Sequence, residues 1–240
     1  MKAGRTLERS ANAIPDHGRA YLTHITMRAC QSLLAILSIL AASPLRAAEA
    51  DVKAAIAVLG SEAGLYEKTR ACQQLSVSGD PTAVPALAAL LGDEKLSDYA
   101  RLGLENIKDP SAGAALRNAL PKLKHKPLAG VIDSLAVRRD AAAVPELIAV
   151  VRDPSRGAAE VALSALGRIA TDEAVAAIRT TLADGPANLR IPAAHAALAA
   201  AEPLAKQGKA AAAKALLEKV GAADMPPHLR EAAERIAVKK

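Results

Sequence analysis

Histidines and cysteines are the residues here that could bind a metal or act as nucleophiles, so their spacing is the first test for an enzyme. The chain has five histidines and two cysteines, and none of them stand at the spacing of a zinc-binding motif. No histidine is followed by glutamate, so repeated His-Glu metal ligands are absent. A Cys-x-x-Cys-His haem motif is also missing. The sequence therefore predicts no metal and no cofactor.

Three further side chains could serve as nucleophile or base, and each has a plain structural interpretation. Ser164 stands inside an apolar helical pattern without the Gly-x-Ser-x-Gly elbow of a hydrolase, which favours a small packing residue. His195 is alone on an alanine-rich stretch, which is typical of a packed or surface histidine. Cys72 falls on an apolar stripe, where we expect a buried thiol; a reactive thiol is the alternative. No catalytic residue is predicted.

The elements that position these residues repeat along the chain. Four aspartates recur at intervals of 29, 31 and 32 residues: Asp80, Asp109, Asp140 and Asp172. Ala-Val-Pro-Ala-Leu-Ala-Ala-Leu-Leu at 83–91 returns 60 residues later as Ala-Val-Pro-Glu-Leu-Ile-Ala-Val-Val. Apolar residues at i, i+3 and i+7 predict a helix in both copies, with proline in its first turn and an aspartate upstream to cap it.

A second helix completes each unit. Residues 158–169 carry apolar side chains at helical spacing, and weaker versions run through residues 100–107 and 128–135. Period-two alternation is absent, so the expected fold class is all-α. One unit of about 30 residues buries too little apolar surface to offset its conformational entropy, whereas stacked units bury both flanks. The sequence therefore predicts an α-solenoid of stacked antiparallel helix pairs.

The segments Leu182-Ala-Asp-Gly-Pro, Val151-Arg-Asp-Pro and Ala-Leu-Ser-Ala-Leu-Gly-Arg-Ile, which ends at Ile169, resemble HEAT repeats of the phycobilisome-lyase type. The resemblance covers roughly residues 52–200. It implies an armadillo-like helical array that binds protein, because only a few members of this repeat class are enzymes. A lyase-like enzyme or accessory factor related to phycobilin lyases is the alternative. The absence of Phe and Trp leaves little to stack on a tetrapyrrole or an extruded DNA base.

The N-terminal part predicts export. An arginine, an apolar run at 33–42 and a small-residue Ala-Ala-Glu-Ala ending at Ala50 form a signal peptide at 27–50, with translation starting at Met27. Residues 1–26 are a mis-assigned start or a disordered extension. The apolar run is shorter than the roughly 20 residues that span a bilayer, although a retained anchor is an alternative. We expect a periplasmic or secreted protein without a stable membrane span.

The exported chain has two predicted parts, a HEAT-like array at 51–206 and a tetratricopeptide-like hairpin with a capping helix at 207–240. From residue 51 onward the chain has 25 Lys and Arg and 22 Asp and Glu, which gives a net charge of +3, compared with +6 for the full chain. Such a mild charge does not favour a nucleic-acid partner. Cytoplasmic nucleic-acid binding requires that the run at 33–42 not act as a signal.

The remaining prediction is a non-catalytic scaffold or accessory subunit that binds a protein partner on the second-helix, concave face of the array. Arginine is favoured at interfaces because its planar guanidinium pairs bidentately and stacks. The candidate contact residues are the charged positions of those helices: Arg101, Glu105, Arg138, Arg139, Arg168 and Arg190.

Overall fold

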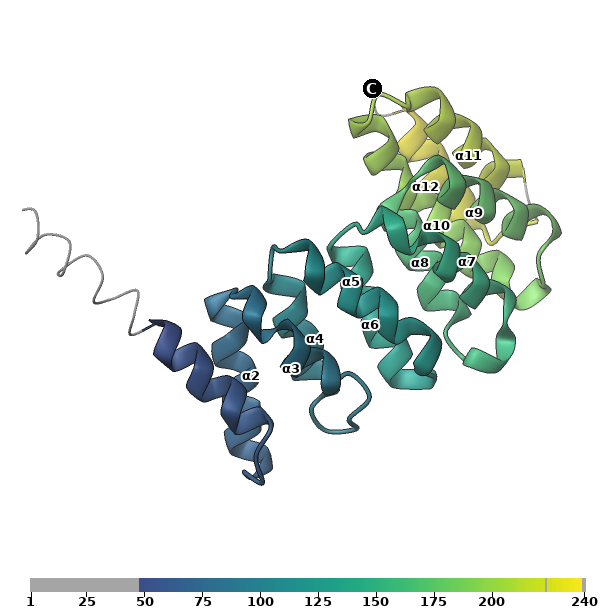
Figure 1. Ribbon diagram of the computed structural model, residues 1–240. Helices are drawn as coiled ribbons and strands as arrows, with labels where there is room; N and C mark the ends of the chain where they lie inside the picture. Colours follow the sequence, from purple (N-terminus) through teal and green to yellow (C-terminus); the bar gives the residue numbers. More distant parts are fainter. Residues whose placement is uncertain (1–47, 223, 239–240) are drawn as a thin grey trace, which may run out of the picture. The chain divides into compact units, whose positions relative to one another are not determined.

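The computed structural model describes residues 48–222 and 224–238, and these residues form helices joined by short turns, with no strand among them. After a helix at 48–59 come α2 (Leu65–Ser78), η1 (Pro81–Ala83), α3 (Val84–Ala89), α4 (Ser97–Asn106), α5 (Pro110–Ala119), η2 (Leu120–Lys122), α6 (His125–Val137), η3 (Ala141–Ala143), α7 (Val144–Arg152), η4 (Pro154–Arg156), α8 (Ala159–Ile169), α9 (Asp172–Asp184), α10 (Ala187–Lys206), α11 (Ala210–Ala222) and α12 (Pro227–Val238). The all-α prediction is confirmed (Figure 1).

The predicted helix caps at Asp80 and Asp140 are confirmed, and Asp109 caps its helix in the same way. Asp80, Asp109 and Asp140 each accept a hydrogen bond from the backbone N–H two residues later, which satisfies a free donor at the helix start. At the fourth unit the cap is Thr171, whose hydroxyl accepts from the N–H of Ala174. Asp172 is instead the first residue of α9, so the repeat marker and the capping residue differ by one position there.

Helices α6 and α10 end in the same type of turn. After α6, the N–H of Arg139 donates to the carbonyl of Ala136 and the next N–H donates to Leu135. After α10, Gly208 and Lys209 make the equivalent pair of bonds. This turn places its middle residue in the left-handed region, where glycine costs least. Gly208 has φ of 76°, whereas Arg139 adopts 50° with a full side chain.

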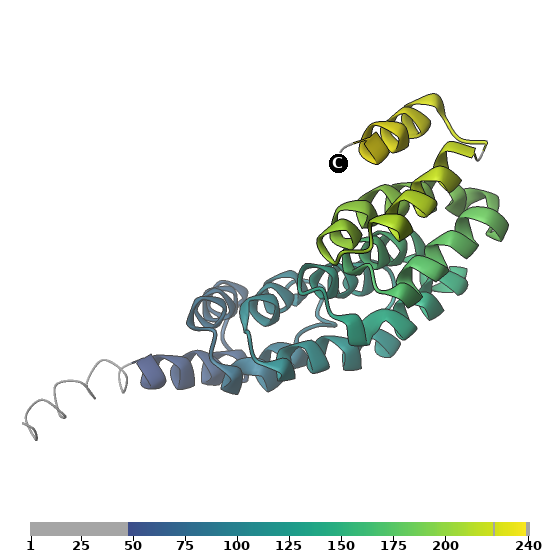
Figure 2. The ribbon, with the colours of Figure 1, turned by 90° about the horizontal axis from the view of Figure 1, so that it is seen from above.

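The chain divides after Asp51, and the second unit, Val52–Lys240, holds every helix from α2 onward. Within that unit α2 contacts α4, α4 contacts α6, α6 contacts α8 and α8 contacts α10 (Figures 1 and 2). We call α2, α4, α6, α8 and α10 the even-helix series. The odd helices contact each other as α3 with α5, α7 with α9 and α9 with α11. Each of α3, α5, α7 and α9 also contacts the even helix that follows it.

The core of this unit is aliphatic and lies between the odd and even helices. Leucines such as Leu87, Leu104, Leu135 and Leu147 are fully buried. The backbones of α8 and α10 approach closely, because a Cβ added at Gly167 would lie 2.4 Å from the carbonyl oxygen of Ala196. Small residues therefore let these two backbones meet.

The C-terminal part of the described residues is also helical. α10 has 20 residues, and α11 and α12 follow it. α11 contacts both α10 and α12. The predicted extension at 1–26 and the apolar run of the signal peptide lie outside the described residues. The last residues before the expected cleavage, 48–50, begin the first helix.

Candidate interaction surface

The large hydrophobic side chains that remain exposed among the described residues all lie on even-numbered helices. The eight large hydrophobic residues that remain exposed are Leu65, Tyr66 and Val77 on α2, Tyr99 and Leu102 on α4, Val137 on α6, Ile191 on α10 and Val238 on α12. None of the described residues of α3, α5, α7, α9 or α11 is among them. Single exposed hydrophobics are ordinary on soluble proteins, but their restriction to one class of helix is not.

Polar side chains link successive members of the even-helix series. Asn106 on α4 donates to the hydroxyl of Ser76 on α2 at 2.7 Å. Lys126 on α6 lies 3.4 Å from the carboxylate of Asp98 on α4. The same carboxylate also accepts from Arg101 at 3.2 Å. Although partial burial raises the pKa of Asp98, the hydrogen bonds from Arg101 and Lys126 outweigh it and lower that pKa.

Arg101 and Arg168, two of the predicted contact residues, belong to this set of links. Arg101 donates to the buried hydroxyl of Ser134 on α6, and its Nε would lie 2.8 Å from a Cβ added at Gly130. Arg168 on α8 pairs with Asp133 on α6 at 2.8 Å. Both arginines are half-buried. They therefore join neighbouring helices of the chain itself.

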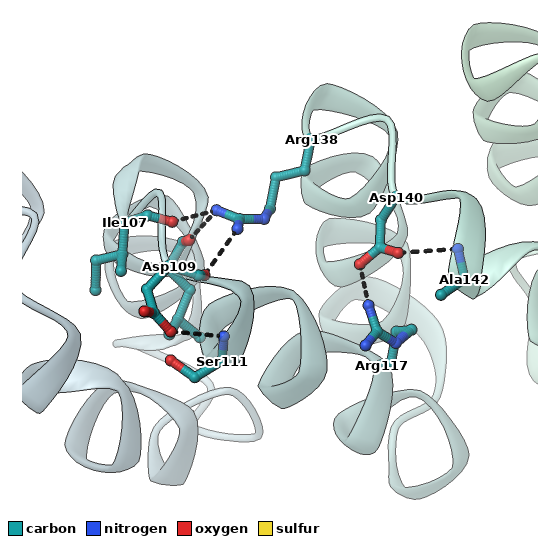
Figure 3. Close-up of polar contacts among 8 residues, drawn as sticks. Ile107, Asp109, Ser111, Arg117, Arg138, Asp140 and Ala142 are labelled. Carbon is teal, nitrogen blue, oxygen red and sulfur yellow. Dashed lines mark hydrogen bonds and ion pairs between the residues drawn. The ribbon is translucent and has the colours of Figure 1, made fainter.

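Arg138, a third predicted contact residue, caps the end of α4 (Figure 3). Its Nη1 donates to the carbonyls of Leu104 at 2.9 Å and Glu105 at 3.0 Å, and also to that of Ile107. Its Nη2 donates to the carbonyl of Asp109 at 3.2 Å. The last carbonyls of a helix lack partners within the helix and carry partial negative charge, so a guanidinium is a favourable cap.

One of the capping aspartates, Asp140, also links two helices. Asp140 accepts from the backbone N–H of Ala142 and also pairs with Arg117 of α5 (Figure 3). Asp109 accepts from Ser111, and hydrogen bonding by Ser111 lowers the pKa of Asp109. The carboxylate of Asp140 thus caps η3 and holds α5 at the same time.

The other three predicted contact residues are placed differently from one another. Glu105 is half-buried on α4 and Arg139 is exposed in the turn after α6. The pKa of Glu202 is lowered mainly by a hydrogen bond from Lys206, and to a smaller extent by the charge of Arg139. Arg190 is exposed near the start of α10 and lines a small hollow beside α9 and α11. The six residues therefore do not form one cluster.

Of the three side chains that could serve as nucleophile or base, one is buried and two are exposed. Cys72 is fully buried, and burial raises the pKa of its thiol to about 11, so it is protonated at neutral pH. Ser164 and His195 are exposed on α8 and α10. Among residues 48–222 and 224–238, no three histidine, cysteine or acidic side chains gather as metal ligands.

A larger cleft, which sequence reasoning missed, has a volume of about 720 Å³. It lies where the α7–α8 turn faces the α9–α10 turn, and its walls include buried Val151, Ala158 and Leu189. The polar residues that line it are Arg152, Glu160, Thr180, Thr181, Asp184 and Asn188. The Asp-Pro and Gly-Pro turns in successive units were the signal that could have located it.

In the described part of the chain, no helix has both the length and the apolar character to cross a bilayer. The chain matches no protein-family model, and no curated protein matches it significantly. The basis for proposing a function is therefore the helical fold, together with the exposed large hydrophobic residues on its even-numbered helices.

Proposed function

We propose that this protein is a HEAT-like α-solenoid that acts as a non-catalytic scaffold or accessory subunit and binds a protein partner through its even-numbered helices. The successive contacts along the even-helix series support the solenoid part of the proposal. The observation that carries the binding part is the restriction of all eight exposed large hydrophobics to even-numbered helices within the described residues. Binding sites concentrate such side chains, because their burial drives association.

In this proposal, hydrogen bonds and ion pairs between the even-numbered helices hold the exposed hydrophobic residues in fixed positions. Arg101, Arg138 and Arg168 each bond to a neighbouring helix of the chain, so their role in the proposal is to fix the spacing of α4, α6 and α8. The direct contacts are then made by the exposed hydrophobics beside them. Arg139 and Glu105 remain proposed contacts, since neither side chain makes an ion pair within the described residues.

The proposal also places the protein outside the cytoplasm, in the periplasm or the medium. The support for this is the apolar run and small-residue ending at 27–50. Fractionation of the tagged chain tests it directly. Recovery only in the cytoplasm would remove the export step and return nucleic-acid binding to consideration.

The binding surface is tested by crosslinked affinity purification from the native host, quantified by mass spectrometry. The test variant is L102E combined with V137E, which places charge on α4 and α6 at exposed positions. The matched control is A149E, which places charge at an exposed position on the odd helix α7. We expect a stoichiometric partner with wild type and control and its loss with the double variant. Equal recovery from all three proteins would refute the assignment of the surface.

A further inference from the structure

Most half-buried cations in the described residues have an internal partner. Arg101, Arg117 and Arg168 pair with aspartates, while Arg138 and Arg156 donate to backbone carbonyls of another helix or turn. Apart from the Arg101–Asp98 pair, which lies within α4, each of these bonds joins two different helices or turns. Exposed cations without an internal partner remain available to a ligand where several of them line one hollow.

One small hollow is lined by three exposed cations that have no internal partner within the described part of the chain. Arg179 on α9, Arg190 on α10 and Lys219 on α11 line it, and none of the three makes an ion pair or a side-chain hydrogen bond among the described residues. The three helices contact one another, so the fold brings together charges that lie far apart in sequence. Bringing like charges together costs free energy, which an anion in the hollow would offset.

The rest of the lining defines what kind of anion fits. Leu182 and Met225 are buried apolar residues, and Asp224 is the single acidic residue of the lining. The hollow measures about 280 Å³, below the roughly 300–1,000 Å³ of pockets for drug-sized ligands, so it fits one small group. Guanidinium groups bind planar or tetrahedral oxyanions through paired N–H donors.

We propose that this hollow is a binding site for a carboxylate or phosphate group attached to a small apolar body. Arg179, Arg190 and Lys219 bind the oxyanion, while Leu182 and Met225 contact the apolar part. A chain terminus or an acidic side chain of a polypeptide would supply the carboxylate, and a phosphorylated small molecule would supply the phosphate. The site lies on α9, α10 and α11 and does not depend on the partner surface proposed above.

The chain offers its own reporter for this site. It contains three methionines, and Met225 alone of them lies in the described residues. Selective labelling of the methionine methyl groups of the full chain therefore gives a simple spectrum in which one signal reports on the hollow. The variant M225L, which keeps the side-chain volume, identifies that signal by its loss.

The labelled protein is titrated separately with N-acetyl-leucine and with inorganic phosphate at constant ionic strength. N-acetyl-leucinamide is the uncharged control for the first ligand, and sodium chloride is the control for added salt. We expect a saturable shift of the Met225 signal with at least one of the two anions and with neither control. Saturation with N-acetyl-leucine alone identifies a carboxylate ligand, and saturation with phosphate alone identifies a phosphate ligand. In R190Q the affinity should fall about tenfold, the effect of losing one charge-assisted hydrogen bond.

K219Q provides an independent second variant, and R152Q, an exposed arginine away from the hollow lining, provides the matched control. The proposal is overturned if no anion shifts the Met225 signal, or if R190Q and K219Q both bind like wild type. It is overturned equally if R152Q weakens binding as much as they do, because the effect would then follow net charge alone.

Discussion

Replacement of Arg138 by alanine should destabilise the fold. This arginine is the largest single polar link between two even helices in the described residues, with four carbonyl acceptors on and beyond the end of α4. Without it, the carbonyls of the fully buried Leu104 and Ile107 lose their side-chain donor. Leaving such groups without a partner costs more than the net value of the bond itself.

The magnitude follows from the donors available. Nη1 carries two hydrogens for three carbonyls, so it contributes about two full hydrogen bonds, and the bond from Nη2 ends at an exposed carbonyl that water can reach. Hydrogen bonds to charged groups contribute about 1.5–3 kcal/mol each, before rehydration of the exposed acceptors. We therefore expect R138A to lower the free energy of unfolding by about 2–3 kcal/mol. R138K keeps a cation at the helix end but loses the planar fork, so we expect about 1 kcal/mol.

Urea unfolding followed by circular dichroism measures these differences, provided that the m-value is unchanged. Hydrogen exchange adds a local readout, in which the amides of α4 should exchange faster in R138A while those of α11 stay as they are. R139A is the neighbouring control and should stay within about 0.5 kcal/mol of wild type. An R138A protein as stable as R139A would refute the capping role. Loss of partner binding in R138A would not by itself identify a contact.

Three other changes test separate features of the packing and the turns. R139G should raise the free energy of unfolding by about 0.5–1 kcal/mol, measured by thermal unfolding, because glycine relieves the left-handed backbone at φ of 50°. G167A should lower it by about 2–3 kcal/mol in urea unfolding, since the new Cβ would meet the backbone of α10. D98N should lower it by less than about 1 kcal/mol at pH 7, because that carboxylate is about half exposed. The folded-state pKa of Asp98 is lowered, so its contribution is present above the unfolded pKa of about 3.9 and is lost as pH falls through the folded pKa.

A control variant or a control condition tests the physical reason given for each of these three changes. G221A adds a Cβ with no atom within 4 Å, so it should be neutral or stabilising by up to about 1 kcal/mol. R139A keeps a side chain at the strained position, and stabilisation equal to that of R139G would contradict the strain argument. For D98N, a difference from wild type that persists in strong acid would show that ionisation of the carboxylate is not its cause.

Much of the secondary structure could be predicted from the sequence, because helical starts depend on neighbouring residues. The repeated aspartates, the prolines at the helix starts and the apolar periodicity located α3, α4, α6, α7 and α8. The one displaced cap, Thr171 in place of Asp172, arose where both residues can cap and adjacent positions compete. Cys72 was placed in the core by its apolar stripe, and it is fully buried.

The roles of the charged side chains could not be predicted in this way. Arg138 and Arg168 were chosen as contact residues from their types, but their bonds reach 29 to 35 residues along the chain to another helix. The hollow lined by Arg179, Arg190 and Lys219 and the cleft between two turns likewise join residues from separate units. Helix boundaries follow from hydrogen bonds within a few residues, which the sequence alone determined. Whether a charge is bonded internally or left exposed depends on which helix packs beside it, and only the tertiary structure decided that.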